Sequence, residues 1–265
     1  MVKTISSLQN PFIKQLIQLK EKSKLRKQTG LFIIEGKREV SLAIKGNYTL
    51  ETLYYYADLF SASEAAALEP YGIDVIEISK AVYEKVAHRE TTEGVIAVAK
   101  SKKLSLKNLN LTSKNPLILV AESPEKPGNI GALLRTADAA NIDAVIIANP
   151  LTDLYNPNII RSSVGGVFTV PIATGTTSEV IAHLKRHNIA IYPAILQESV
   201  AYDTIDFKTP SALVIGTESS GLSEEWRKNS TAKIQIPMEG KLDSMNLSVA
   251  AGILIFEAKR QRKYL

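Results

Sequence analysis

Three short and almost wholly aliphatic segments constrain the fold most. They cover residues 117–121, 144–148 and 212–215, and segments with helical spacing separate them. Such continuous apolar runs are typical of parallel strands that helices cover on both faces. The sequence therefore predicts an α/β domain with a mainly parallel sheet in the later part of the chain.

The pattern of the remaining segments extends this prediction along the chain. Further strands are expected at 167–170, 189–194 and 233–236, and helices at 129–140, 159–163, 177–187, from Ser223 and from Asn246. Residues 1–100 alternate in the same way, with strands at 31–35, 52–56, 74–78 and 94–99 and helices at 37–44, 61–68 and 79–87. We expect a small α/β domain at 1–100, a polar linker at 101–115 and a second domain at 116–265.

Positive charge is concentrated at the start of the chain. Asn10 and Pro11 are typical of a helix start, and apolar residues then recur at helical spacing to about residue 26. Residues 1–30 contain seven Lys or Arg against one acidic residue, whereas the whole chain has a formal charge of +5. Such a segment attracts polyanions. Charge alone supports nucleic-acid binding and a merely solvated helix face about equally.

Several classes of protein are excluded or disfavoured. The sequence has no Cys, which excludes a disulfide scaffold, a Cys zinc site and a Cys nucleophile and fits a reducing cytoplasm. No apolar run is long enough for a membrane span, and the N-terminus lacks the apolar core of a signal peptide. The three histidines, His88, His183 and His187, form no metal-binding pattern. We therefore expect no metal and histidines that lie at the surface.

Four loops follow predicted strands and are rich in Gly, Pro, Asn and Ser. They begin after Ala121, Ile147, Ile215 and Ile236. Ligands of parallel sheets bind beyond the carboxyl ends of the strands, and helix N-termini there present free N–H groups. The loop from Gly216 to Ser223 has the spacing of a phosphate-binding loop. However, Leu222 replaces the required Lys and Glu218 adds a negative charge, which disfavours a nucleotide triphosphatase.

A set of polar residues remains in these loops: Asn129, Arg135, Glu218, Ser244 and Asn246. Each has a structural explanation of its own. The Asn and Ser residues could cap helices, Glu218 could cap a loop, and Arg135 could pair with Asp138. Their joint occurrence at successive strand ends favours a functional site.

Three motifs in these loops resemble the SpoU (TrmH-type) branch of the SPOUT methyltransferases. The motifs are PGNIGALLRTA at 127–137, LVIGTESSGL at 213–222 and IPMEG with SMNLSVA at 236–250, and the resemblance covers about residues 115–262. Residues 161–165 are similar to an intermediate segment of the family. Residues 32–36 and 92–97 resemble a small ribosomal-protein-like RNA-binding domain. Residues 121–126 and Asn141 depart from the family pattern.

The resemblance implies a fold and a function. It implies a SPOUT domain with a trefoil knot, a homodimer, S-adenosylmethionine as cofactor, and methyl transfer to a ribose 2′-hydroxyl of RNA. Ribosomal RNA is the expected substrate, and transfer RNA is the second candidate. Two competing hypotheses are a non-catalytic RNA-binding protein of the same fold and a nucleotide-binding enzyme that uses the Gly216 loop.

The resemblance also assigns roles to residues. The catalytic set is Arg135, Asn129, Glu218, Ser244 and Asn246. The cofactor set is Gly216, Thr217, Ile236, Met238 and Met245. The basic helix then supplies RNA contacts from Lys20, Lys22, Lys24, Arg26 and Lys27. Because a guanidinium stays protonated, we expect Arg135 to bind phosphate and stabilise the developing alkoxide rather than to act as the base.

Overall fold

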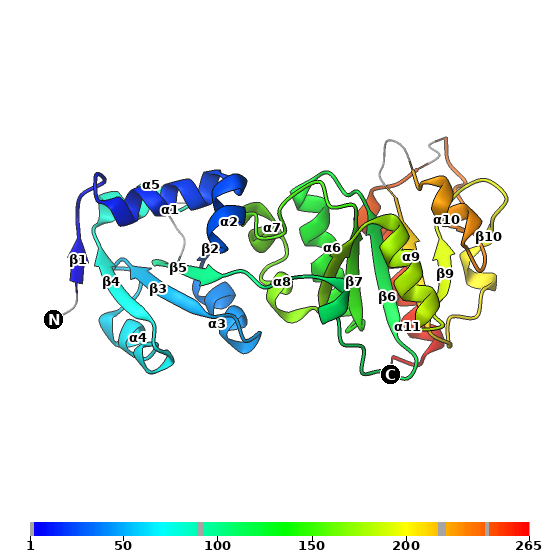
Figure 1. The fold of residues 1–265 in the computed structure, drawn as a ribbon, viewed down its shortest axis with the longest axis horizontal. Coiled ribbons are helices and arrows are strands. Elements are labelled where there is room, and N and C mark those ends of the chain that lie inside the picture. The colour runs from blue at the N-terminus through cyan, green and yellow to red at the C-terminus, as the bar shows by residue number, and fades with distance from the viewer. Residues whose placement is uncertain (1–2, 89–92, 217–220, 242–243, 265) are drawn as a thin grey trace. The chain divides into compact units, whose positions relative to one another are not determined.

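The structure is a computed structural model that describes residues 3–88, 93–216, 221–241 and 244–264. The chain forms two compact units (Figure 1). Unit 1 comprises Met1–Lys102 together with Asp153–Thr169, and unit 2 comprises Lys103–Thr152 together with Val170–Leu265. The segment Asp153–Thr169 therefore groups with the N-terminal unit, although the sequence placed it inside a continuous second domain at 116–265.

Unit 1 contains a mixed sheet with the strand order β1-β4-β3-β5-β2. Its strands are β1 (Lys3–Ile5), β2 (Leu31–Glu35), β3 (Leu50–Tyr55), β4 (Asp74–Ile78) and β5 (Val95–Lys100). β1, β4 and β3 run parallel, whereas β5 is antiparallel to both β3 and β2. The strands at 31–35 and 74–78 were predicted with these bounds. The three-residue β1 was missed because it is too short to show a period.

The helices of unit 1 lie on both faces of this sheet. They are α1 (Pro11–Glu21), α2 (Ser23–Thr29), α3 (Lys37–Lys45), α4 (Ala62–Ala66) and α5 (Lys80–Val86). In Figure 1, α1 and α5 cover one face and α3 and α4 the other. α1 starts as predicted, since the Asn10 side chain accepts a hydrogen bond from the Phe12 amide. The helix does not continue to residue 26, because Lys22 adopts an extended conformation between α1 and α2.

The segment Asp153–Thr169 packs into unit 1 through aromatic side chains. It contains α7 (Pro157–Ser162) and α8 (Gly166–Thr169). The ring of Tyr155 stacks on Phe32 at a centroid distance of 4.4 Å, and the ring of Phe168 lies 5.1 Å from that of Tyr48. The strand predicted at 167–170 is wrong. A short apolar run does not distinguish strand from helix, and here tertiary packing decides in favour of a helix.

Unit 2 contains a parallel sheet with the strand order β8-β7-β6-β11-β9. Its strands are β6 (Leu117–Glu122), β7 (Ala144–Ala148), β8 (Ile172–Gly175), β9 (Ala190–Pro193) and β11 (Ser211–Ile215). All neighbouring strands in this order run parallel, and β6, β7 and β11 are buried along their whole length, which confirms the predicted parallel sheet. A separate small pair joins β10 (Val200–Ala201) and β12 (Ile234–Gln235). The strand β8 was missed.

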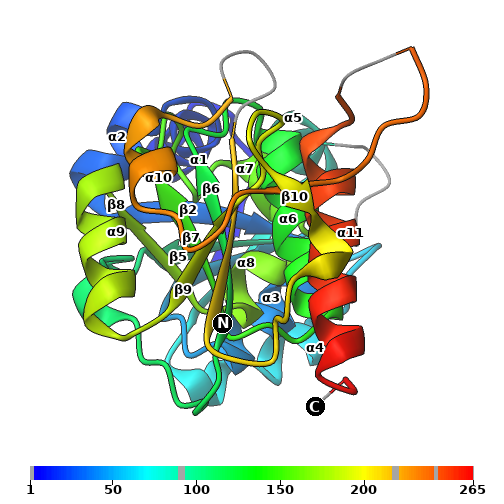
Figure 2. The ribbon, with the colours of Figure 1, turned by 90° about the vertical axis from the view of Figure 1, so that its right-hand side faces the viewer.

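Helices cover both faces of the unit 2 sheet. α6 (Pro127–Ala139) and α11 (Leu247–Gln261) lie on one face, and α9 (Thr177–Arg186) and α10 (Glu224–Lys228) on the other (Figure 2). The α9 side packs Val180, Leu184 and Trp226 against the strands. His183 also lies on α9 and is only 7% exposed, so the expectation of a surface histidine is wrong at this position.

Residues 103–115, expected as part of a linker, lie along the edge of the unit 2 sheet. The Leu104 carbonyl accepts hydrogen bonds from the Thr174 amide and hydroxyl, and Leu106, Leu109 and Leu111 pack against the core.

Within the described residues no helix combines the length and hydropathy needed to cross a membrane. The trefoil knot stays a prediction.

Candidate cofactor and catalytic site

The strand order of unit 2 defines where a ligand can bind. From β6 the chain proceeds to β7 and β8 on one side, and later adds β9 and β11 on the other. The order therefore reverses between β6 and β11, and such a switch point opens a crevice beyond the carboxyl ends of the strands. Ala121 of β6 is level with Ile215 of β11, so Glu122 and Gly216 leave neighbouring strands at the same end.

A cavity of about 370 Å³ lies in unit 2 among the segments that follow β9, β11 and β12. Such a volume falls within the usual range for small-molecule sites. Five residues singled out from the sequence line it: Gly216, Ile236, Met238, Ser244 and Met245. The structure thus brings together the loops of the second and third motifs and the start of α11. Thr217 and Glu218, the other predicted members, lie outside the described residues.

The sequence missed part of the cavity wall. Ile195, Leu196 and Gln197 follow β9 and line the cavity, as does Arg227 of α10. The loop after β9 carries few of the Gly, Pro and Asn residues that marked the other loops. The rule that ligands bind at the carboxyl ends of neighbouring strands could have identified it, because β9 pairs with β11.

Gly216 is required by a close approach of two backbone segments. A Cβ atom at this position would lie 2.6 Å from the Gly221 carbonyl carbon and 2.7 Å from the Leu222 nitrogen. Both atoms belong to the main chain and cannot rotate away. Main-chain groups at the end of β11 can therefore face the cavity directly, without an intervening side chain.

Asn129 and Asn246 connect the first and third motifs. The Asn246 amide donates a hydrogen bond of 3.3 Å to Oδ1 of Asn129. Asn246 also caps α11, since its Oδ1 accepts from the Ser248 amide at 2.9 Å. Asn129 does not cap α6, because Lys126 occupies that position and Asn129 lies inside the first turn. Asn246 follows Met245 and precedes Leu247, which both line the cavity.

Arg135 lies on the exposed surface of α6. It follows Asn129 by six residues, which is about 1.7 helical turns or about 9 Å along the helix. α6 packs against α11, whose N-terminus carries Asn246. One pair of helices therefore presents Asn129, Arg135 and Asn246.

The predicted RNA-contacting residues of unit 1 differ in their surroundings. Lys22, Lys24 and Lys27 are exposed. Lys20 is half-buried, and its Nζ donates hydrogen bonds to the carbonyls of Val86 and Ala87 at 2.7 and 2.9 Å.

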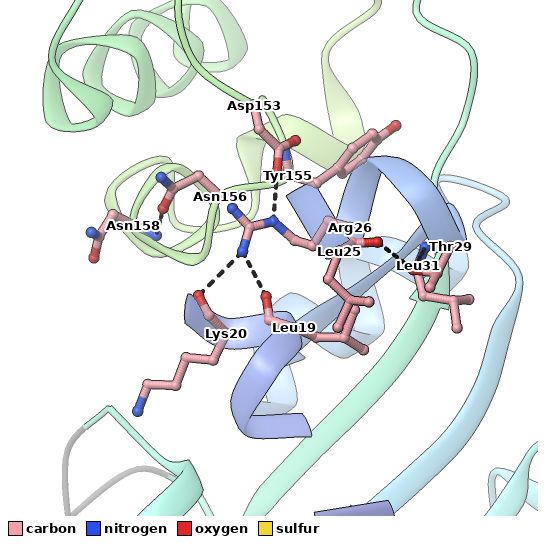
Figure 3. Close-up of polar contacts among 10 residues, drawn as sticks. All are labelled: Leu19, Lys20, Leu25, Arg26, Thr29, Leu31, Asp153, Tyr155, Asn156 and Asn158. Carbon is pink, nitrogen blue, oxygen red and sulfur yellow. Dashed lines mark hydrogen bonds and ion pairs between the residues drawn. The ribbon is translucent and has the colours of Figure 1, made fainter. Parts of the chain in front are cut away.

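Arg26 is buried and takes part in the packing of unit 1. Its Nε forms an ion pair of 2.5 Å with Asp153, and its Nη1 donates to the carbonyls of Leu19 and Lys20 at 2.6 and 3.2 Å (Figure 3). The side chain is only 4% exposed. Its polar groups hold the α1–α2 turn to Asp153, so Arg26 has a structural role in place of the expected contact with RNA.

Unit 2 is therefore an α/β domain with a candidate ligand site at the carboxyl ends of a parallel sheet. Residues 116–256 match the SpoU rRNA Methylase family, and residues 10–97 match the MRM3-like substrate binding domain. The chain belongs to the SpoU rRNA methylase family.

Relatives and solved structures match nearly the whole chain. The 23S rRNA (guanosine(2553)-2′-O)-methyltransferase RlmP of Bacillus subtilis is 27% identical and covers 97% of this chain and 100% of its own length. A crystal structure of an RNA 2′-O ribose methyltransferase is 36% identical, with a TM-score of 0.83 over 98% of this chain and 99% of that one. The AdoMet-bound rRNA methyltransferase of Sinorhizobium meliloti is 31% identical, with a TM-score of 0.88 over 98% of both chains.

Proposed function

We propose that this protein transfers a methyl group from S-adenosylmethionine to a ribose 2′-hydroxyl of ribosomal RNA. One observation carries the proposal: the cavity at the strand ends adjoins Asn246, which contacts Asn129. The family membership and the rRNA methyltransferases among its relatives support the reaction and the substrate class. The chain has no Cys, which suits the reducing cytoplasm in which we expect it to act.

The described residues of the cavity fit S-adenosylmethionine. Ile195, Ile236 and Met245 offer an apolar wall for the nucleoside, and Gly216, which has no side chain, lines the cavity with its main chain. Arg227 is the charged side chain among the described lining residues, and its guanidinium pairs with Glu224 and donates a hydrogen bond to Gln197. Its remaining N–H groups can bind the carboxylate of a ligand. When bound, the cofactor supplies an electrophilic methyl group on a sulfonium.

The residues of this chain contribute positioning and charge. Methyl transfer requires an in-line approach of the hydroxyl oxygen, so the orientation of both reactants supplies much of the rate. Asn129 and Asn246 carry amides that can orient the ribose. Arg135 keeps its proton and stabilises the negative charge that develops on the 2′-oxygen and on the neighbouring phosphate.

The role of Arg135 is tested by measuring tritiated methyl transfer to ribosomal RNA. Arg135→Ala lowers kcat about 100-fold or more, as expected when a charge-stabilising donor is removed. Arg186→Ala removes an exposed arginine of α9 and serves as the matched control with unchanged turnover. Near-normal turnover of the Arg135 variant, with its fold intact by circular dichroism, would remove Arg135 from the mechanism.

We propose that Lys22, Lys24 and Lys27 bind RNA phosphates. All three are exposed around the junction of α1 and α2. Changing them to Gln lowers the slope of log affinity against log salt by about 0.7–0.9 for each phosphate contact that is lost. The control replaces three exposed lysines of unit 2, which are Lys107, Lys185 and Lys228. Equal slopes for the wild-type protein and the first variant would mean that the three lysines only solvate the helix.

We also propose that the protein is a homodimer that uses α11. This helix is apolar on most sides, and its Val249 and Phe256 are 52% and 42% exposed. The two residues are seven positions apart and therefore lie on one face of the helix. Phe256→Lys is expected to convert a dimer to a monomer in light scattering. A wild-type protein that runs as a monomer would contradict the proposal.

A further inference from the structure

Glu122 is a buried carboxylate that joins three elements of unit 2. It is the last residue of β6 and is 6% exposed. Its Oε1 accepts hydrogen bonds from the hydroxyls of Thr177, at 2.5 Å, and Ser223, at 2.8 Å. Its Oε2 accepts from the Ser223 amide at 2.8 Å. Thr177 is the first residue of α9, and Ser223 precedes α10.

These bonds explain why a carboxylate is tolerated at a buried position. An ionised carboxylate is costly to bury unless hydrogen-bond donors replace the water that it loses. Charge-assisted bonds of this kind are short and stronger than neutral ones. The Thr177 hydroxyl is held in turn by Asn149, whose amide donates to it at 2.8 Å. The carboxylate is therefore part of a connected polar network rather than an isolated charge.

The network lies at the switch point of the sheet and reaches the wall of the cavity. Ser223 directly follows Leu222, which is buried and lines the cavity. At the other end of the same loop, Gly216 directly follows β11. The last residue of β11, Ile215, pairs with Ala121 of β6, which directly precedes Glu122. Both ends of the loop 216–222 are thus fixed to the end of β6, one by strand pairing and the other by the Glu122 side chain.

We propose that Glu122 is a positioning residue for the cofactor. Its carboxylate holds Ser223, and through it the neighbouring Leu222, in the position in which Leu222 lines the cavity, while Glu122 itself does not contact the ligand. The inference rests on the proposed function, because the ligand is the cofactor named there.

The test compares variants of the full-length protein by titration calorimetry with S-adenosylhomocysteine, the stable product of the cofactor. Glu122→Ala leaves the Ser223 amide and two hydroxyls without their acceptor and is expected to raise the Kd about tenfold or more. Glu122→Gln retains an acceptor for the amide, and its NH₂ can donate to the hydroxyl oxygens. The Kd of Glu122→Gln is therefore expected to stay within about threefold of the wild-type value.

Thr177→Val is the control for a purely structural effect. It removes the bond from Glu122 to α9 but keeps both bonds to Ser223. Its thermal stability is expected to fall while its Kd for S-adenosylhomocysteine stays within about twofold of wild type. If Glu122→Ala does not fold, Ser223→Ala replaces it, with an expected rise in Kd of about tenfold from the loss of one hydrogen bond to a charged group. A Ser223→Ala protein with the wild-type Kd would then overturn the inference.

The outcomes separate this inference from the proposed function. A folded Glu122→Ala protein with the wild-type Kd would overturn the inference, as would a Thr177→Val protein that loses as much affinity as Glu122→Ala. A wild-type protein that does not bind S-adenosylhomocysteine would instead refute the proposed cofactor.

Discussion

Replacing Gly216 by Ala tests whether the close packing of Gly216 against Gly221 and Leu222 forms the wall of the cofactor cavity. The added methyl group would lie 2.6 Å from the Gly221 carbonyl carbon and 2.7 Å from both the Gly221 oxygen and the Leu222 nitrogen. These distances are far below van der Waals contact, and all three atoms belong to the backbone. Gly221 and Leu222 must therefore move away from residue 216, and the cavity wall at Leu222 moves with them.

The size of the effect follows from the cost of overpacking. Inserting a methyl group where no side chain can rotate away costs about 1–3 kcal/mol. If the whole cost falls on the positions of Gly221 and Leu222 that bind the cofactor, the Kd for S-adenosylhomocysteine rises about 5- to 150-fold. Titration calorimetry measures the Kd, and circular dichroism confirms that the variant is folded.

Gly72 provides a control in unit 1 and is not among the described residues that line the cavity. Gly72→Ala strains the backbone at a φ of +72°, but a Cβ atom there would meet nothing within 4 Å. This variant is therefore expected to bind S-adenosylhomocysteine like the wild-type protein, which separates a general loss of stability from a change in the cavity. The reasoning would be refuted if Gly216→Ala bound S-adenosylhomocysteine with the wild-type Kd, or if Gly72→Ala lost as much affinity as Gly216→Ala.

Two further predictions concern stability and are checked by urea unfolding. Asp153→Asn is expected to lower the free energy of unfolding by about 3–5 kcal/mol, because it leaves the buried Arg26 guanidinium without its counter-charge. Glu84→Gln, in an exposed i,i+4 pair with Lys80, is the control and leaves the midpoint of unfolding nearly unchanged. A small effect of Asp153→Asn would contradict this account. Burial lowers the pKa of His183 below its ordinary value of 6.5, so the unfolded chain takes up the proton first as the pH falls. The contribution of His183 to the free energy of unfolding is therefore fully present above pH 6.5 and is lost as the pH falls below it. If the free energy of unfolding of a His183→Gln protein declined as steeply with pH, His183 would not be the group responsible.

The central strands of unit 2 were predictable from the sequence because buried strands consist almost entirely of aliphatic residues. β6, β7 and β11 consist of aliphatic residues on both faces, as a strand between two helical layers requires. The prediction failed at 167–170 and at β8, where runs of a few residues carry no readable period. Long-range packing decided those elements.

Part of the candidate site was also predicted from the composition of the chain. Glycine loops marked Gly216, Ile236 and Met245, which line one cavity. The sequence did not distinguish the buried Arg26 from the exposed lysines beside it, because its partner Asp153 is 127 residues away. Nor did it show the use of Glu122, whose three donors come from elements 55 and 101 residues further along the chain.

A crystal structure of the protein with S-adenosylhomocysteine tests the central claim most directly. The account predicts ligand density against Gly216, Ile236 and Met245, with its sulfur facing the pair formed by Asn129 and Asn246. Ligand bound elsewhere on the molecule, or bound in this cavity with its sulfur turned away from that pair, would contradict it.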